Sequence, residues 1–270
     1  MKNIDEVSLS TGVFGKENSP DDLLRFVDMA LESGYKYIEL SRRQYDIGSR
    51  AEAILRSGVK VWSVHGYLDG RGISDDESVR RNMIDMEIER IHEAALFGKV
   101  PYVLHYLNNR IDPRYDKLYR QTIEELYAAT HEAGLIMAVE TSPYKPKTTE
   151  RYPFSKEISD FVRAYQLDDM RMTIDINHSN LNEDLFEVCA NCDGLIVNVH
   201  MSNNHGEWED HLPPYDGVID FPAVFAALRK HGYTGPANLE MHSEESVSVE
   251  WLTHVRKYTE EKLFGKGSDV

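Results

Sequence analysis

Asp175 is the residue whose surroundings most need a chemical explanation, because it lies inside an apolar run that reads as a buried strand. Met172, Ile174 and Ile176 form that run. An ionised carboxylate in such a place is costly unless it is paired or bound to a cation. His178 follows three residues later, where the chain is expected to leave the strand. An aspartate and a histidine this close together at a strand end indicate a metal site or a catalytic pair.

The same arrangement recurs along the chain, where apolar runs end in one histidine, aspartate or glutamate. The residues that end these runs are Glu39, His65, His105, Glu140, Asp175, His200 and Glu240. A single match of this kind is mostly accidental, but repeated matches are much less so. We therefore interpret the set as a metal centre. The alternative is that polar strand ends simply meet solvent.

The elements that would position these residues alternate along the whole chain. The expected strands are 7–13, 35–40, 59–65, 100–105, 135–140, 172–176, 194–200 and 237–240. Helical patterns follow them, and the clearest are 75–97, 155–166, 182–190 and 219–230. Alternation of strand and helix, repeated eight times without a linker, predicts a parallel sheet.

The number of strands and the length of the chain favour a closed barrel over an open doubly wound sheet. We expect an α/β fold, a single (β/α)8 TIM barrel over residues 1–270, with a loose tail from about residue 265. All strands of such a barrel end on one face, where active sites are built. The residues that end the apolar runs should therefore converge at one mouth.

Composition excludes several classes of protein. The chain has 270 residues, 41% of them apolar, and a formal net charge of −16, which argues against a nucleic-acid surface. No apolar run approaches membrane-spanning length, and residues 1–7 lack the apolar core of a signal peptide. Cys189 and Cys192 are too few for a disulfide framework, so we expect a cytoplasmic protein in which this pair is structural.

Several motifs resemble the xylose isomerase-like superfamily, which contains sugar isomerases and epimerases, inosose dehydratases and endonuclease IV. The motifs are Ala138-Val139-Glu140, Ile174 to His178, Val199-His200, His211, Asp216 to Phe221, Gly232 to Gly235 and Leu239-Glu240. The resemblance implies the barrel and its metal site but leaves the substrate open. One departure is Tyr215-Asp216-Gly217 in place of the expected Gly-x-Gly, which leaves the shape of that loop open.

The resemblance implies two different ligand sets. In the isomerase branch, one divalent ion would be held by Glu140, Asp175, His200 and Glu240. In the endonuclease branch, a multi-zinc cluster would be completed by His65, His105, His178, His211 and an acid near Glu209. Both sets are present here. Three carboxylates with one imidazole suit Mn²⁺, Mg²⁺ or Co²⁺, whereas Zn²⁺ is favoured if the further histidines also bind.

The chemistry of the isomerase set is proton transfer. A divalent ion chelated by a sugar's carbonyl and adjacent hydroxyl stabilises an enediolate, and two flanking carboxylates can pass a proton between the carbons. Glu140 and Glu240 come from strands nearly across the barrel, so we predict that they are the catalytic pair, with pure ligation as the alternative. The residues predicted to contact the substrate are His65, His105, His178, His211 and Trp208.

Other sequence features narrow the possible reactions and the class of substrate. No lysine ends a strand, which argues against a Schiff-base aldolase. The loops 202–210 and 242–245 are acidic and would repel a phosphate at the usual barrel site. Arg42 and Arg43 could hold a carboxylate, but we favour a solvated pair.

We therefore predict a metal-dependent isomerase or epimerase that acts on a small unphosphorylated sugar or polyol. A dehydratase of an inosose or a 3-dehydroshikimate-like acid is the first alternative, and it would use the same metal and bases. A multi-zinc phosphodiesterase is disfavoured by the charge of the chain. A barrel that binds a sugar without turning it over is the remaining alternative. We expect no nucleic-acid or membrane partner, and a homo-oligomer is left open.

Overall fold

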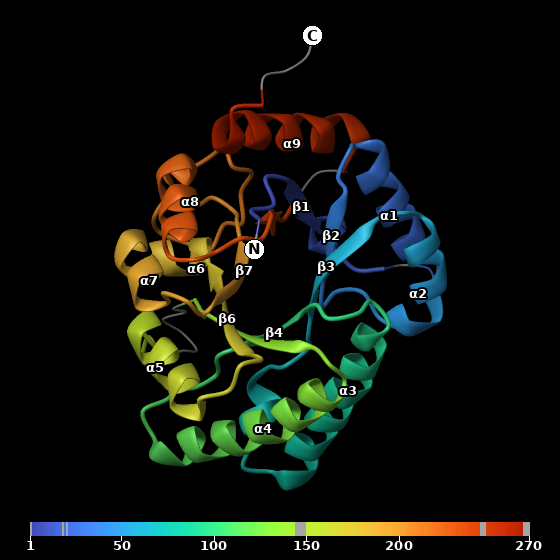
Figure 1. Cartoon of the computed structure of the whole chain (residues 1–270). Coiled ribbons are helices and arrows are strands. Elements are labelled where there is room, and N and C mark those ends of the chain that lie inside the picture. The colour runs from blue at the N-terminus through green and yellow to red at the C-terminus, as the bar shows by residue number, and fades with distance from the viewer. Residues whose placement is uncertain (1, 18, 20, 144–149, 244–246, 267–270) are drawn as a thin grey trace.

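Strand and helix alternate along the chain in the computed structural model, which describes residues 2–17, 19, 21–143, 150–243 and 247–266. The strands are β1 (Val7–Ser10), β2 (Tyr37–Leu40), β3 (Lys60–His65), β4 (Pro101–His105), β5 (Ile136–Glu140), β6 (Met170–Asp175), β7 (Ile196–His200) and β8 (Ala237–Leu239). They form one parallel sheet in the order β7-β6-β5-β4-β3-β2-β1-β8. Figure 1 shows the helices arranged as a ring outside these strands.

The sheet closes on itself at two places. β1 pairs with β8 as well as with β2, with Val7 opposite Ala237. The β7 and β8 edges meet through a bridge between Met201 and Leu239, where Met201 N donates to Asn238 O at 2.8 Å. The predicted (β/α)8 TIM barrel is therefore confirmed.

The helices pack their apolar faces against the outside of the barrel. They are α1 (Asp22–Glu32), α2 (Ile47–Arg56), α3 (Glu77–Ala95), α4 (Pro113–Glu132), α5 (Ser155–Tyr165), α6 (Ile176–Asn180), α7 (Leu185–Asn191), α8 (Phe221–Lys230) and α9 (Val249–Phe264). Two short 3₁₀ helices, η1 (Thr11–Phe14) and η2 (Gly70–Ile73), follow β1 and β3. In α5, for example, Ile158, Phe161 and Val162 are buried, while Lys156, Asp160 and Arg163 are exposed.

Glycines follow two of the longest helices. Gly98 follows α3 with φ +88° and Gly134 follows α4 with φ +74°. Residues with a Cβ rarely adopt this left-handed conformation, so glycine is favoured where a helix must stop and turn back toward the barrel.

Three predicted strands end earlier than expected, and for the eighth the difference is one residue, because β8 ends at Leu239. The first stops at Ser10, whose hydroxyl accepts a hydrogen bond from Gly12 N and caps η1. The sixth stops at Asp175, and Ile176 is the first residue of α6 rather than part of the strand. Asp175 Oδ1 accepts from His178 N at 2.9 Å, so the carboxylate caps a helical turn in place of further strand pairing.

The predicted C-terminal tail lies mostly outside the described residues, whereas the two cysteines can be compared with their prediction. Gly265, with φ +63°, ends α9, and residues 267–270 of the predicted tail lie outside the described residues. Within the described ranges, no helix has the length and apolar character needed to span a membrane. Cys189 and Cys192 are free and buried, and burial raises the pKa of Cys189 to about 12, which fits a structural role.

Candidate metal centre and active site

Four residues converge at the mouth of the barrel from four adjacent strands. Glu140, Asp175 and His200 end β5, β6 and β7, and Glu240 directly follows β8. Each offers one ligand atom, and these atoms all lie within 4.8 Å of one another. His200 Nδ1 is 2.9 Å from Glu140 Oε1 and 3.0 Å from Glu240 Oε2. The predicted ligand set is thus brought together, and both members of the predicted catalytic pair contact the same imidazole nitrogen.

Glu39, on β2, lies on the other side of His200. Its Oε2 is 2.8 Å from His200 Nε2 and accepts hydrogen bonds from Ser63 Oγ at 2.6 Å and Asn238 Nδ2 at 3.1 Å. Burial lowers the pKa of His200, but Glu240, Glu39 and Glu140 outweigh burial and hold that pKa well above its ordinary value. The sequence identified Glu39 only as a residue that ends a strand. The signal for its contact with His200 was a carboxylate within the apolar run of β2.

The carboxylates differ in how easily they take up a proton. Burial raises the pKa of Glu140, but His200 and His105 outweigh it and hold that pKa well below the usual range. Burial raises the pKa of Asp175 to about 6, with repulsion from Glu240 adding to it and His178 opposing it. Glu140 is therefore the stronger acid of these two buried groups.

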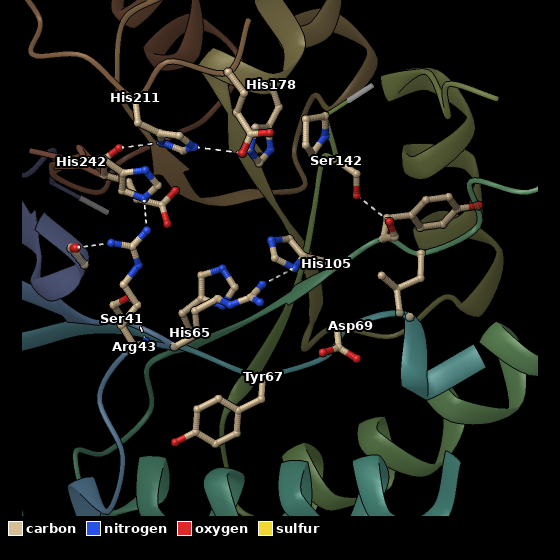
Figure 2. Close-up of a pocket in the computed structure, with 18 of the residues that line it drawn as sticks. Ser41, Arg43, His65, Tyr67, Asp69, His105, Ser142, His178, His211 and His242 are labelled. Carbon is tan, nitrogen blue, oxygen red and sulfur yellow. Dashed lines mark hydrogen bonds and ion pairs between the residues drawn. The ribbon is translucent and has the colours of Figure 1, made fainter. Parts of the chain in front are cut away.

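His65 and His105 form a second group with Glu140. His65 Nε2 is 3.2 Å and His105 Nε2 3.4 Å from Glu140 Oε2. His65 Nδ1 lies 2.8 Å from Gly66 O, which orients the ring so that Nε2 faces the carboxylate. Figure 2 shows the two rings side by side in the middle of the pocket.

A third group lies on the far side of the pocket. His178 Nε2 is 3.3 Å and His211 Nε2 3.0 Å from Glu209 Oε1. His178 Nδ1 lies 2.8 Å from Thr141 O, and His211 Nδ1 lies 3.0 Å from Glu240 O, so backbone carbonyls orient both rings. His211 has φ +52°, a left-handed conformation that turns its ring toward Glu209. Figure 2 shows this group separated from His65 and His105.

The residues of the first group suit a divalent cation. Glu140 Oε2 and Asp175 Oδ2 are buried and accept no hydrogen bond among the described residues, although imidazole nitrogens lie 3.2 Å and 3.3 Å from them. Buried carboxylate oxygens of this kind are stable when they bind a cation. Carboxylate-rich sets favour hard ions such as Mn²⁺ or Mg²⁺, and the neighbouring imidazoles also suit Zn²⁺.

Members of all three groups line one cavity with a volume of about 660 Å³, and from the first group this member is Glu240. Its lining includes all four histidines that were predicted to contact the substrate: His65, His105, His178 and His211. Trp208 does not line the cavity, and its side chain is 66% exposed. The predicted contact between Trp208 and a substrate is not supported by this position. It stays a prediction. His242, which the sequence did not single out as a site residue, does line the cavity.

The loop that departs from the expected Gly-x-Gly has a defined shape. Gly217 has φ +142°, and a Cβ there would lie 2.3 Å from Asn203 Oδ1. Asn203 Oδ1 accepts hydrogen bonds from Asn204 N and Ile219 N, both at 3.0 Å. The loop therefore packs closely on the segment after β7. Residues 244 and 245 of the other acidic loop lie outside the described residues.

Comparison with known proteins identifies the family. A family model described as the xylose isomerase-like TIM barrel matches residues 27–264. The chain belongs to the xylose isomerase-like TIM barrel family. An L-ribulose-5-phosphate 3-epimerase from Shigella flexneri is 26% identical over 234 residues, which cover 81% of this chain and 78% of that protein.

Two further matches cover less of the matched protein or are more distant in sequence. An uncharacterized protein of Methanocaldococcus jannaschii is 23% identical over 161 residues, and the match spans about half, 51%, of that protein. A solved structure of an L-ribulose 3-epimerase superposes with a TM-score of 0.77 at 20% identity, covering 97% of this chain and 95% of that one. This likeness establishes a shared xylose isomerase-like fold.

Proposed function

We propose that this protein is a divalent-metal-dependent isomerase or epimerase that acts on a sugar or polyol by proton transfer through an enediolate. The observation that carries the proposal is the position of Glu140 and Glu240, each about 3 Å from the same nitrogen of His200 within a four-residue ligand group. The epimerase names of two relatives support the same class of reaction. The expectation of an unphosphorylated substrate rests on the acidic loops after β7 and β8.

The residues around the cavity have distinct tasks in this proposal. A divalent ion, when held by Glu140, Asp175, His200 and Glu240, would polarise the substrate's carbonyl and neighbouring hydroxyl. His200 outweighs burial and lowers the pKa of Glu240, so this carboxylate is ionised at neutral pH and ready to accept a proton. Glu140 is ionised for the same reason and can return the proton to the adjacent carbon.

His105 and His65 would orient the substrate's hydroxyl groups. Burial lowers the pKa of His105 to about 4, with further lowering by His65 and Arg42, so its ring is neutral at pH 7. A neutral imidazole can donate one hydrogen bond and accept another, which matches the two roles of a hydroxyl. His178 and His211 face the opposite side of the cavity as donors, because carboxylates outweigh burial and raise the pKa of His178 to about 10 and the pKa of His211 above its ordinary value.

Turnover in D₂O tests the proton-transfer step. The carbon-bound proton must pass through a carboxylate that can exchange with solvent, so deuterium should appear at the carbon next to the carbonyl. The measurement is mass and proton NMR analysis of product from a panel of ketoses, inososes and keto acids supplied with Mn²⁺. Isomerised product without deuterium would contradict exchange through a carboxylate. A product lighter by one water would identify the dehydratase instead.

A multi-metal phosphodiesterase is the second candidate, and one observation favours it. The described residues offer three further groups of potential ligands beside the first: His65-His105-Glu140, His65-His200-Glu240 and His178-Glu209-His211. Glu140 belongs to two of the groups, so adjacent ions could share it. Closely spaced ions suit in-line displacement at phosphorus better than they suit enediolate chemistry.

Metal stoichiometry separates the two candidates. Protein purified without chelator should contain about one divalent ion per chain by elemental analysis if the first group alone is a high-affinity site. The variant His178→Ala should then leave the metal content unchanged. Two or three zinc ions per chain, with loss of one in His178→Ala, would favour the phosphodiesterase.

A further inference from the structure

Two adjacent arginines enter the cavity from the loop after β2. Arg42 and Arg43 both line the cavity. Arg42 Nη1 lies 3.3 Å from His105 Nδ1, and Arg43 Nη2 lies 2.9 Å from His242 Nε2. Figure 2 shows Arg43 pointing at His242. Within the described part of the chain, neither guanidinium forms an ion pair with a carboxylate, although the protein has 46 acidic and 30 basic residues.

The groups that the two arginines contact carry no negative charge. Arg42 contacts the imidazole of His105, and Arg43 contacts the imidazole of His242 and donates to Gly12 O at 3.3 Å. Two half-buried guanidinium groups therefore lie in a cavity without an anionic partner among the described residues. A ligand that supplies an anion would provide the missing partner.

The loop that carries Arg42 and Arg43 is held from several sides. Ser41 N donates to Thr11 Oγ1 at 2.9 Å, and Ser41 O accepts from Arg90 Nη2 at 3.0 Å. Arg90 is buried beneath the ring of Tyr67, whose hydroxyl donates to Gln44 O at 3.1 Å. The backbone is thus fixed directly before and after the two arginines. Such support is typical of a binding site that is formed before its ligand arrives.

The arginines lie close to the proposed metal ligands. His105 faces Arg42 through Nδ1 and Glu140 through Nε2, at 3.3 Å and 3.4 Å. The ring of His242, which faces Arg43, stacks on the ring of His211 with centroids 4.2 Å apart. Only one imidazole therefore separates Arg42 from the carboxylate predicted to move the proton. A ligand of a few carbon atoms can reach both.

We propose that Arg42 and Arg43 bind an oxyanion, a carboxylate or a phosphate, at the end of the substrate remote from the reacting carbons. This inference rests on the proposed function and defines its substrate as a short acidic sugar or polyol. These cations come from the loop after β2, two strands from β8, and Arg43 contacts His242 in the acidic loop after β8, so their charge would offset the repulsion of an anion by that loop. A phosphate at this position would replace the expectation of an unphosphorylated substrate.

Calorimetric binding of three matched compounds tests the inference. Ribitol, ribonate and ribitol 5-phosphate share a carbon chain and differ in whether the end group is neutral, a carboxylate or a phosphate. The Mn²⁺-loaded protein should bind at least one of the acidic compounds about tenfold or more tightly than ribitol, and the tighter of the two identifies the oxyanion. The double variant Arg42→Gln, Arg43→Gln should lose this preference. Its affinity for the acidic compound should fall by on the order of 10- to 100-fold.

Two controls make the result specific. Arg56→Gln removes one positive charge at an exposed position of α2, outside the cavity, and should leave all affinities unchanged. The double variant with lysines keeps the charge but not the fork of donors, and should fall between the wild type and the glutamine variant. Circular dichroism of each variant shows whether the barrel is folded, and if the glutamine pair is unfolded, the lysine pair decides alone.

The possible results separate this inference from the proposed function. Equal affinity for the three compounds, or a preference that survives loss of both arginines, overturns the inference and leaves the metal chemistry untouched. Acidic binding that depends on the arginines but not on Mn²⁺ supports the inference and counts against the proposed metal-dependent reaction. Absence of binding by all three compounds overturns the inference.

Discussion

Replacing Glu240 with glutamine should lower turnover by about 10²–10⁴-fold while the metal stays bound, because this is the usual size of a general acid–base contribution. Glutamine keeps one oxygen ligand and nearly the same volume, but it cannot accept a proton at neutral pH. Glu240 Oε2 lies 3.0 Å from His200 Nδ1, so the amide can remain in place. The measurement is kcat on the substrate found by the D₂O panel, with metal content determined on the same sample.

Glu207→Gln is the matched control for this variant. Glu207 is exposed in the loop after β7 and does not line the cavity, so its replacement should leave kcat within about twofold, as for most surface changes. Near-normal turnover by Glu240→Gln would show that Glu240 is only a ligand. Loss of the ion from Glu240→Gln would assign that variant's inactivity to the metal, and Glu140→Gln would then test the proton transfer.

Replacing His200 with alanine should remove the bound ion and also weaken the fold. His200 contacts Glu39, Glu140 and Glu240, all within 3.0 Å, so its loss leaves buried carboxylates without their shared partner. Removing one partner of a buried ion pair typically costs about 3–5 kcal/mol, which is a large part of the stability of a domain but leaves it folded. Elemental analysis and urea unfolding measure the two effects.

Asp175→Asn separates metal loss from loss of stability. Asparagine has nearly the same shape and can still cap α6 by accepting from His178 N, so the free energy of unfolding should change much less than in His200→Ala. It lacks the negative charge, so metal affinity should still fall. A full complement of tightly bound ion in both variants would contradict the assignment of this ligand group.

The strand ends were predictable because one physical rule covers them. Glu140, Asp175 and His200 each follow an apolar run, and a parallel barrel brings such positions to the same face. Pairing in register then places neighbours side by side, as with Asp175 opposite His200. The pattern predicted that seven such residues would meet at this face, and the resemblance to the xylose isomerase-like superfamily implied which four of them form the ligand set.

Features that depend on loops were predicted less well. The apolar Ile176 looked like one more strand residue, and nothing local showed that the Asp175 carboxylate would cap a helix instead. His242 lies two residues beyond Glu240, and its partner Arg43 is remote in sequence. The spacing of residues along the chain therefore could not predict their contact. Trp208 looked suited to stack on a sugar, but an exposed loop turns it away from the cavity. Loop conformations depend on tertiary contacts that one sequence does not reveal.

The pairing of β1 with β8 has a consequence for how the protein is made. Val7 needs Ala237 as its neighbour, a residue that leaves the ribosome about 230 positions later. At roughly 5–20 residues per second, the first strand waits about ten to fifty seconds for that partner. Throughout this time the nascent sheet has an open edge that a second copy could occupy, which makes the unfinished chain prone to aggregation. Glu240 arrives just after β8, so the ligand group is completed only when the barrel can close.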